Sequence, residues 1–316
     1  MSLGVSNALQ QLEHTPPCSA MATPHDAQVG GYTKSNRGRK PELSLSMAFT
    51  PAVSHGLRAG RKRGKARAMN APSVPQIFST ARRERRLARA LAREQRPDLA
   101  RFIWDEMGED VAERLAFVRH EPVRPLLMGT VPLWLSEKLG AQPQASDPES
   151  PYPLNGYDFV GALGVFDAVN DLPGALIHIR NALAPGGLAI VSFVGGASLP
   201  RLREAMIASE PDRPAARMHP LVDPRAAPGL LQRAGWKDPV VDTHTLKVRY
   251  PTLDRLVHDL RDQGLGSALA DQPPTLSRSA FHRARDAFAR NAEADGKITE
   301  TFEIITLTGR RSLAGT

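Results

Sequence analysis

Apolar residues along this chain follow the period of a strand in some segments and the period of a helix in others. The clearest strand-helix-strand succession lies in the middle of the chain. Residues 157–160 begin like a buried strand, residues 171–183 carry apolar side chains at helical spacing, and residues 188–194 form an apolar run. Two strands that flank about a dozen helical residues predict a right-handed crossover unit with parallel strands. Sheets built from such units bind ligands at the carboxyl ends of their strands.

The same two periods extend to both sides of this unit. Helices are predicted over residues 76–96, 99–118, 131–139, 199–209, 224–234, 253–263 and 279–291. Strands are predicted over residues 125–128, 240–250 and 299–308. Residues 140–156 contain four prolines and are predicted to be a loop, because proline suits neither a helix interior nor a central strand. Alternating strands and helices predict an α/β fold.

Composition sets the first quarter of the chain apart. Residues 1–75 are rich in Gly, Ser, Pro and Arg, and they show no period that would bury a core. They hold ten Lys or Arg and three acidic residues, so they supply almost all of the net charge of +8. We expect a disordered basic leader over 1–75, an N-terminal helical segment over 76–120, the sheet domain over 121–310 and a tail over 311–316. An organellar transit peptide is the alternative interpretation of the leader, and Met69 is an alternative start of translation.

Composition also disfavours several kinds of site and location. The one cysteine, Cys18, excludes an internal disulfide, and the nine scattered histidines lack metal-ligand spacing. No apolar run approaches the ~18 residues that span a membrane, and the amino terminus lacks the order of a secretory signal. Residues 58–67 are basic without interleaved aromatics, which disfavours specific nucleic-acid binding. We expect a cytoplasmic protein without a transmembrane segment.

The helix predicted over residues 76–96 is unusually basic. Its apolar residues are Ile77, Phe78, Leu87 and Leu91, and seven arginines surround them. Two interpretations stay open, because such a helix can face an acidic partner or can simply present a solvated face.

Several short motifs occur in one order along the second half of the chain. They are Tyr157-Asp158-Phe159-Val160, Val169-Asn170-Asp171-Leu172-Pro173, Leu183-Ala184-Pro185-Gly186-Gly187-Leu188, Arg233-Ala234-Gly235-Trp236 and Thr301-Phe302-Glu303-Ile304. This succession resembles the class I S-adenosylmethionine-dependent methyltransferases. It is most similar to the bacterial relatives of the mitochondrial complex I assembly factor that hydroxylates an arginine, and more distantly to the biotin-pathway methyltransferase that esterifies malonyl-carrier protein. The resemblance spans residues 77–310 and implies a Rossmann-like methyltransferase fold.

The chain departs from this family where the family holds its cofactor. The family's first strand ends in an acidic residue and a G-x-G-x-G loop, but here Leu127 takes the place of the acid and Gly129 is the one glycine. Pro132 removes an amide, and its neighbours add bulk where glycine would admit the backbone. Only 17 residues separate Leu139 from Tyr157, whereas two strands with a crossover helix need ~30. We therefore expect a truncated parallel sheet without the family's second and third strands.

The resemblance also implies site residues. It assigns cofactor contacts to Gly129, Leu163, Gly164, Val165, Phe166 and Asp167. It assigns substrate contacts to Gly195, Gly196, Arg203 and Tyr250. The family's second strand ends in an acid that holds the ribose hydroxyls, for which Asp147 and Glu149 are candidates only by proximity.

Each of these assignments has a plainer alternative. Residues 161–164 also suit a tight strand exit without a ligand. Asp167 suits a general base or a site for a cationic group, and equally a solvated loop acid or helix cap. Gly195-Gly196 with Arg203 also suits a turn followed by an exposed helix arginine. Asp242 and His244 share a strand face, but such a pair without a nucleophile is usually structural.

Two functions follow from the resemblance. The first is methyl transfer from S-adenosylmethionine to a protein or a small acidic acceptor, in which catalysis comes largely from positioning. The alternative is a non-catalytic or hydroxylase-type assembly factor of respiratory complex I that has lost cofactor binding. Fold alone does not separate the two functions.

Overall fold

The crossover unit predicted from the central apolar runs is present in the computed structural model, which describes residues 75–94, 96, 98–153, 155–212 and 214–313. It consists of β3 (Tyr157–Leu163), α4 (Leu172–Ala182) and β4 (Leu183–Val194). The two strands run parallel, with Gly161 opposite Ile190. The predicted leader lies outside the described residues except for Pro75, and residues 314–316 of the predicted tail lie outside them too.

The described residues form a single sheet of six strands in the order β2-β1-β3-β4-β6-β5. The other four strands are β1 (Pro125–Gly129), β2 (Pro143–Gln144), β5 (Lys237–Tyr250) and β6 (Ile298–Arg310). Strands β2, β1, β3 and β4 are mutually parallel, whereas β6 runs antiparallel to both β4 and β5. This is the mixed α/β arrangement of a Rossmann-like methyltransferase fold.

The loop prediction for residues 140–156 is wrong at one point. Pro143 and Gln144 pair in parallel with β1 and form the short edge strand β2. Proline is tolerated at this edge because no further strand needs its missing amide hydrogen. The absence of two family strands stays a prediction.

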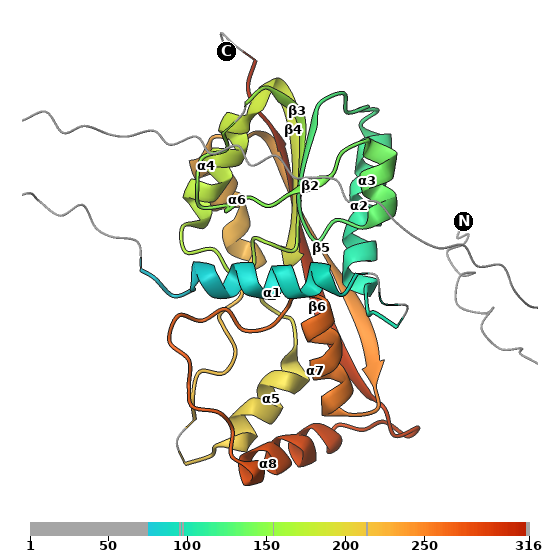
Figure 1. The fold of residues 1–316 in the computed structure, drawn as a ribbon, viewed down its shortest axis with the longest axis vertical. Coiled ribbons are helices and arrows are strands. Elements are labelled where there is room, and N and C mark those ends of the chain that lie inside the picture. Colours follow the sequence, from blue (N-terminus) through green and yellow to red (C-terminus); the bar gives the residue numbers. More distant parts are fainter. Residues whose placement is uncertain (1–74, 95, 97, 154, 213, 314–316) are drawn as a thin grey trace, which may run out of the picture. The chain divides into compact units, whose positions relative to one another are not determined.

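Helices cover both faces of the sheet, and each face has its own apolar core (Figure 1). The helices are α1 (Thr80–Ala92), α2 (Phe102–Phe117), α3 (Leu133–Leu139), α5 (Pro200–Ser209), α6 (Ala227–Ala234), α7 (Leu253–Asp262) and α8 (Arg278–Ala289), with a 3-10 turn over Pro224–Ala226. Helices α2 and α3 pack on one face with α5, α7 and α8, and α4 and α6 pack on the other. No helix among the described residues is long and apolar enough to cross a membrane.

Helix α1 crosses the carboxyl ends of the parallel strands (Figure 1). It begins at Thr80 rather than at Gln76, because the preceding residues are extended and pair with the chain after α7. Phe78 forms a bridge with Leu269, and its backbone amide donates to Oδ1 of Asn170 at 2.8 Å. The edge of the sheet that binds ligands in related folds is therefore the edge that α1 covers.

Beyond this edge, α5, α7 and α8 surround the extended ends of β5 and β6 (Figure 1). The start of α5 is fixed by Glu300 of β6, whose Oε2 accepts from the amide of Leu202 at 2.9 Å. Burial raises the pKa of this carboxyl although it caps the helix. The helix group of α5, α7 and α8 is thus held to the sheet by a buried polar contact as well as by apolar packing.

Candidate functional site

The exits of β1 and β3 touch each other at the covered edge of the sheet. The amide of Thr130 donates to the carbonyl of Leu163 at 2.8 Å, and its hydroxyl reaches the same oxygen at 3.2 Å. Gly129 and Gly164 both have positive φ, and a Cβ on either would collide with the opposite exit. The two exits are therefore in direct contact, with no space between them for a ligand group.

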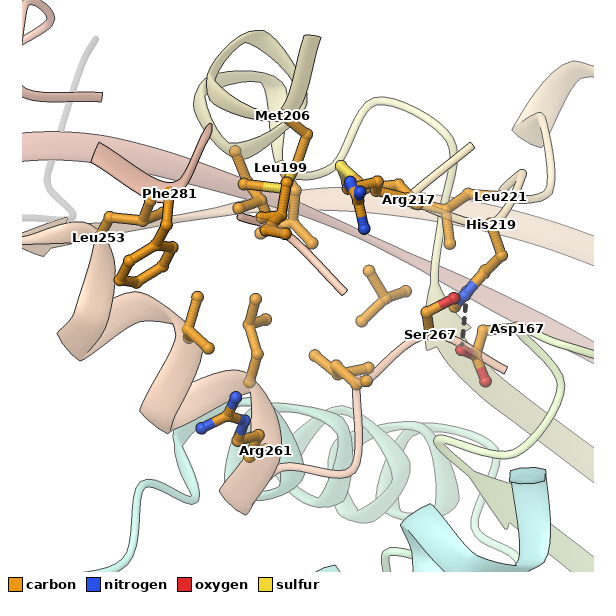
Figure 2. Close-up of a pocket in the computed structure, with 18 residues that line it drawn as sticks. Asp167, Leu199, Met206, Arg217, His219, Leu221, Leu253, Arg261, Ser267 and Phe281 are labelled. Atoms are coloured by element: carbon orange, nitrogen blue, oxygen red, sulfur yellow. Dashed lines mark ion pairs between the residues drawn. The ribbon is translucent and has the colours of Figure 1, made fainter. Parts of the chain in front are cut away.

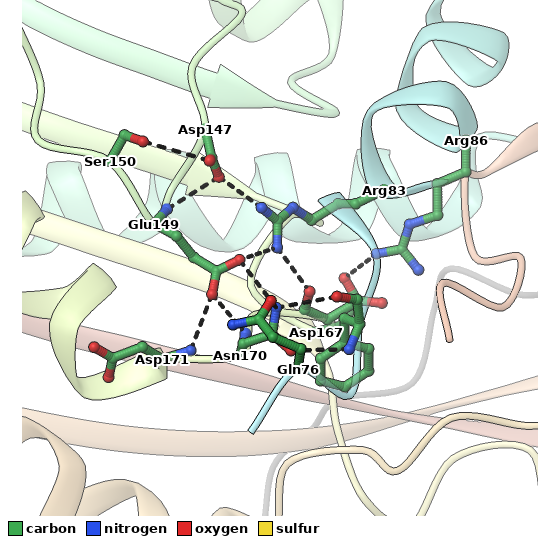
Figure 3. Close-up of polar contacts among 11 residues, drawn as sticks. Gln76, Arg83, Arg86, Asp147, Glu149, Ser150, Asp167, Asn170 and Asp171 are labelled. Carbon is green, nitrogen blue, oxygen red and sulfur yellow. Dashed lines mark hydrogen bonds and ion pairs between the residues drawn. The ribbon is translucent and has the colours of Figure 1, made fainter. Parts of the chain in front are cut away.

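Arg83 of α1 occupies the next polar position along this edge (Figure 3). Its guanidinium is buried and lies 2.6 Å from Oδ1 of Asp147 and 2.7 Å from Oε2 of Glu149. It also donates to the carbonyl of Ala168 at 3.0 Å, and the other oxygen of Glu149 accepts from the amide of Asn170. The two acids nearest to β2 are thus ion-paired with the chain's own arginine.

Arg86 of α1 neutralises a third acid, Asp167 (Figure 3). Its guanidinium lies 2.6 Å from Oδ1 of Asp167, and Nε2 of His219 lies 3.5 Å from Oδ2. Burial opposes ionisation of Asp167, but the charge of Arg86 and the nearby ring of His219 outweigh it and lower its pKa to about 2. Asp167 is therefore a buried carboxylate, neither a solvated loop acid nor a helix cap. The cap of α4 is Asp171, which accepts from the amide of Gly174.

Asp167 and His219 also line an apolar cavity of about 300 Å³ beyond the strand ends (Figure 2). Side chains of α5, α7 and α8 supply most of its wall, together with the segments around residues 217–221 and 265–267. Its apolar lining residues are Val194, Leu199, Leu202, Met206, Met218, Leu221, Leu253, Val257, Leu260, Leu265, Leu276 and Phe281. Arg217, Arg261 and Ser267 are its remaining polar side chains. A cavity of this size with few polar groups is typical of a small-molecule site.

The predicted cofactor residues do not line one common cavity. Leu163 and Phe166 are buried in the two cores of the sheet, and Gly164 lies against Thr130. Asp167 lines the apolar cavity, whereas Val165 lines a second cavity of about 320 Å³ beneath α1. The assigned set is thus divided between the protein interior and two separate spaces.

The predicted substrate residues are also separated. Gly196 and Arg203 line an open groove of about 570 Å³ at the start of α5. Gly195 is buried, and its amide donates to the carbonyl of Glu303 at 2.7 Å. Tyr250 is only 1% exposed, and burial raises the pKa of its hydroxyl.

Asp242 and His244 hold α2 against β5 rather than forming a site. The carboxylate of Asp242 pairs with Arg114 at 2.5 Å, and Nε2 of His244 lies 3.1 Å from Glu106. Among the described residues, no group of three His, Cys, Asp or Glu side chains is placed to hold a metal ion.

Sequence reasoning missed the buried arginines because it considered only an acidic partner or a solvated face for the arginines of this helix. Ile77 and Leu91 are exposed, whereas Arg83, Arg86 and Ala90 are buried. Their spacing of three and four residues marks one helix face, and that signal is visible in the sequence. Their carboxylate partners lie 64 to 81 positions away, so local patterns could not identify them.

The residues at this edge do not fit S-adenosylmethionine in the position that the resemblance implies. Leu127 is buried where the family has an acid, and Thr130 closes the first strand exit against the third. The carboxylates of Asp147 and Glu149 are ion-paired with Arg83, which leaves them poorly placed to accept from ribose hydroxyls. The edge keeps the cavity of about 320 Å³ beneath α1, but its acids are not free to accept from a cofactor.

Residues 82–241 match a family described as a methyltransferase domain. The arginine-hydroxylase NDUFAF5 of Rattus norvegicus is 27% identical over 300 residues, covering 82% of this chain and 85% of that protein. The Homo sapiens protein of that name is 30% identical over 164 residues, covering 50% of this chain and 47% of that protein. The malonyl-[acyl-carrier protein] O-methyltransferase of Xylella fastidiosa is 29% identical, covering 43% of this chain and 46% of that protein.

A solved structure is similar at lower identity. The N-methyltransferase NodS of Bradyrhizobium japonicum, in complex with S-adenosyl-L-homocysteine, covers 72% of this chain and 98% of its own, with a TM-score of 0.37 and 11% identity. The chain spans about half the length of several curated relatives. The match to the methyltransferase domain, however, extends over half of this chain. The chain therefore belongs to the methyltransferase domain family, within the class I S-adenosylmethionine-dependent methyltransferase superfamily.

Proposed function

We propose that this protein is a methyltransferase-like assembly factor that works without bound S-adenosylmethionine. The observation that carries the proposal is the pairing of buried Arg83 with Asp147 and Glu149 at the carboxyl edge of the sheet. The same helix places Arg86 on Asp167, so α1 neutralises three acids at this edge, Asp147, Glu149 and Asp167. Catalysis by methyl transfer requires a bound methyl donor, which this arrangement disfavours.

The energies support this proposal. Removing one partner of a buried ion pair costs about 3 kcal/mol at the lower end of the measured range. A ligand with micromolar affinity binds with about 8 kcal/mol. If binding had to displace Arg83 from its two acids, about 3 kcal/mol of this would be lost, which weakens the ligand's affinity roughly a hundredfold. The contact between Thr130 and Leu163 adds a steric obstacle to this electrostatic one.

Likeness to a mitochondrial arginine-hydroxylase supports the assembly role that the sequence resemblance implies. Both the Rattus norvegicus and the Homo sapiens relatives carry the name of a mitochondrial arginine-hydroxylase, and the first of them aligns over most of both chains. From the sequence resemblance to a complex I assembly factor we propose subunits of respiratory complex I as partners. The composition of the chain supports the cytoplasm as the proposed location. The partner, rather than the cofactor, is what this chain would share with those relatives.

A thermal-shift titration tests the absence of the cofactor. A micromolar ligand at about 1 mM stabilises a protein by about 4 kcal/mol, which corresponds to about 10 °C for a domain of this size. We expect S-adenosylmethionine at this concentration to raise the melting temperature by less than about 2 °C. A malonyl-carrier-protein methyltransferase in the same buffer serves as the positive control. A shift near that of the control would refute the proposal.

Co-purification tests the assembly role. We expect the tagged full chain to retain NADH dehydrogenase subunits through a stringent wash, while the tag alone does not. Loss of these subunits from the eluate would remove complex I from the proposal and leave the cofactor result untouched.

Methyl transfer to a protein or a small acidic acceptor is the second candidate. It is favoured by one observation, since Asp167 of the predicted cofactor loop lines a cavity that is large enough for an acceptor. Incubation with methyl-labelled S-adenosylmethionine and a cell extract distinguishes the candidates. A labelled product that depends on this chain would establish the second candidate over the first.

A further inference from the structure

Three arginines of α1 and the arginine that caps its end form a basic groove together with one arginine of α7. Arg82, Arg85, Arg89 and Arg93 line this groove with Arg261, and its volume is about 420 Å³. The four α1 positions are three or four residues apart, so they share one face of the helix. We call these five residues the arginine groove.

Most of the positive charge in the arginine groove is not neutralised by the protein. Arg93 pairs with Asp262 at 2.7 Å. Within the described ranges, no carboxylate forms an ion pair with Arg82, Arg85, Arg89 or Arg261. Four like charges around one concave space repel each other, and an anion bound between them would relieve that repulsion.

The arginine groove adjoins the apolar cavity. Arg261, Gly266 and Ser267 line both spaces, so the two meet at this point of the wall. In Figure 2, Arg261 lies at the edge of the cavity, away from Asp167 and His219. A charged surface site and an apolar interior site thus share one boundary.

The charges of the cavity determine how a ligand would be oriented. At the inner end, Asp167 is ionised and already compensated by Arg86, so this end offers no free positive charge to an anion. Arg217 is engaged by Glu210 at 2.7 Å and by the carbonyl of Pro274. An anionic group would therefore bind at the Arg261 side, with its apolar part directed inward.

We propose that the cavity and the arginine groove together bind a single-chain anionic amphiphile, such as an alkyl phosphate or a fatty acid. The apolar tail lies in the cavity between α5, α7 and α8, and the anionic head lies on Arg261 and the arginines of α1. The space of about 300 Å³ is at the lower end of small-molecule sites, which suits a medium-length tail. Each methylene buried there tightens binding roughly fourfold. This inference does not depend on whether S-adenosylmethionine binds.

Calorimetry of the full chain with three probes tests the proposal without any mutation. The probes are decyl phosphate below its micellar concentration, inorganic phosphate and decanol. Because head and tail each contribute, we expect decyl phosphate to bind at least roughly tenfold more tightly than either fragment. Equal affinity for decyl phosphate and inorganic phosphate would overturn the proposal, and so would the absence of binding.

Two variants and a matched control locate the site. We expect Arg261→Gln to weaken decyl phosphate roughly tenfold by removing a charge-assisted contact, and Met206→Trp to weaken it by filling the cavity. Arg233→Gln removes an exposed helix arginine outside the arginine groove and should leave the affinity unchanged. Equal losses in Arg261→Gln and Arg233→Gln would mean non-specific attraction and would refute the site.

A vesicle experiment distinguishes a free amphiphile from a membrane surface. Vesicles with anionic lipid present the same head-group chemistry on a bilayer. We expect decyl phosphate to bind in the absence of vesicles and Met206→Trp to impair that binding, with thermal melting confirming that the variant is folded. Binding to vesicles that is unaffected by Met206→Trp, together with no binding of the free probe, would assign the arginines to a membrane surface and overturn the cavity proposal.

Discussion

Asp167 is the residue on which the electrostatics of the covered edge depend. It is 3% exposed, and the guanidinium of Arg86 lies 2.6 Å from it. A carboxylate in this position stays charged only because the arginine and His219 compensate for lost hydration. Its ionisation is therefore linked to folding.

The pH dependence of stability should report this residue. The folded-state pKa of Asp167 lies near 2, below its ordinary value of 3.8, so its stabilisation is present above that value and is lost as the pH falls through 2. The contribution is about 2 kcal/mol. We expect Asp167→Asn to be less stable at neutral pH and to lose less of its remaining stability between about pH 4 and 2. Urea denaturation of both proteins across this pH range tests the prediction. If the free energies of unfolding of the two proteins fell in parallel with pH, the prediction would be contradicted.

Arg83 allows a matched comparison on one helix. Arg83→Met leaves Asp147 and Glu149 without their partner, and we expect a loss of about 3 kcal/mol in the free energy of unfolding. Arg85→Met changes an exposed arginine of α1 that has no carboxylate partner among the described residues, and it should cost within about 0.5 kcal/mol. Equal costs would show that the buried pair contributes nothing specific. Adding Glu149→Gln to Arg83→Met should restore part of the loss, because it removes one unpaired charge.

The sequence alone predicted few of the contacts at this scale. It identified Asp167 as a candidate but left its surroundings open, because Arg86 and His219 approach it from distant segments. Arg83 and Arg86 were counted among the basic residues of their helix without being recognised as buried. Their partners could be found only once the topology had placed α1 over the strand ends.

At the scale of elements, the contact between the exits of β1 and β3 defines the covered edge. Gly129 and Gly164 adopt positive φ, and Thr130 bonds to Leu163 across the gap. Glycine is needed here for two reasons, the backbone conformation and the close approach of the opposite exit. The two reasons can be separated by experiment.

Substituting two glycines of similar positive φ separates the effect of the close approach from that of the backbone conformation. Gly164→Ala places a Cβ against the hydroxyl of Thr130, whereas Gly140→Ala, also at positive φ, meets nothing within 4 Å. We expect Gly140→Ala to cost about 1 kcal/mol from its conformation, and Gly164→Ala to cost at least about 1 kcal/mol more. Chemical denaturation of both variants measures the difference. The same cost at both positions would mean that the exits are not packed together in solution.

Periodicity predicted most of the elements but not their junctions. The crossover unit and the long final strands follow from apolar patterns that the core requires. The edge strand β2 was missed because two residues carry no period and one of them is proline. The start of α1 was predicted four residues too early, since the pairing of Phe78 with Leu269 is a tertiary contact.

At the scale of the whole described unit, α1 connects the sheet to the helix group around the cavity. Arg83 contacts the segment after β2, Arg86 contacts both Asp167 and the carbonyl of Gly266, and Arg93 contacts Asp262 of α7. One face of this helix is therefore internal structure, while the arginine groove on another face stays open. The chain has the methyltransferase fold. In our proposal, the contacts of α1 at the covered edge stabilise the folded unit and do not bind a cofactor.

Isothermal titration of the full chain with S-adenosylmethionine tests the central claim most directly. If α1 and the joined strand exits take the place of the cofactor, the titration will show no saturable binding with a dissociation constant below about 1 mM. Saturable one-to-one binding in the micromolar range would contradict the account.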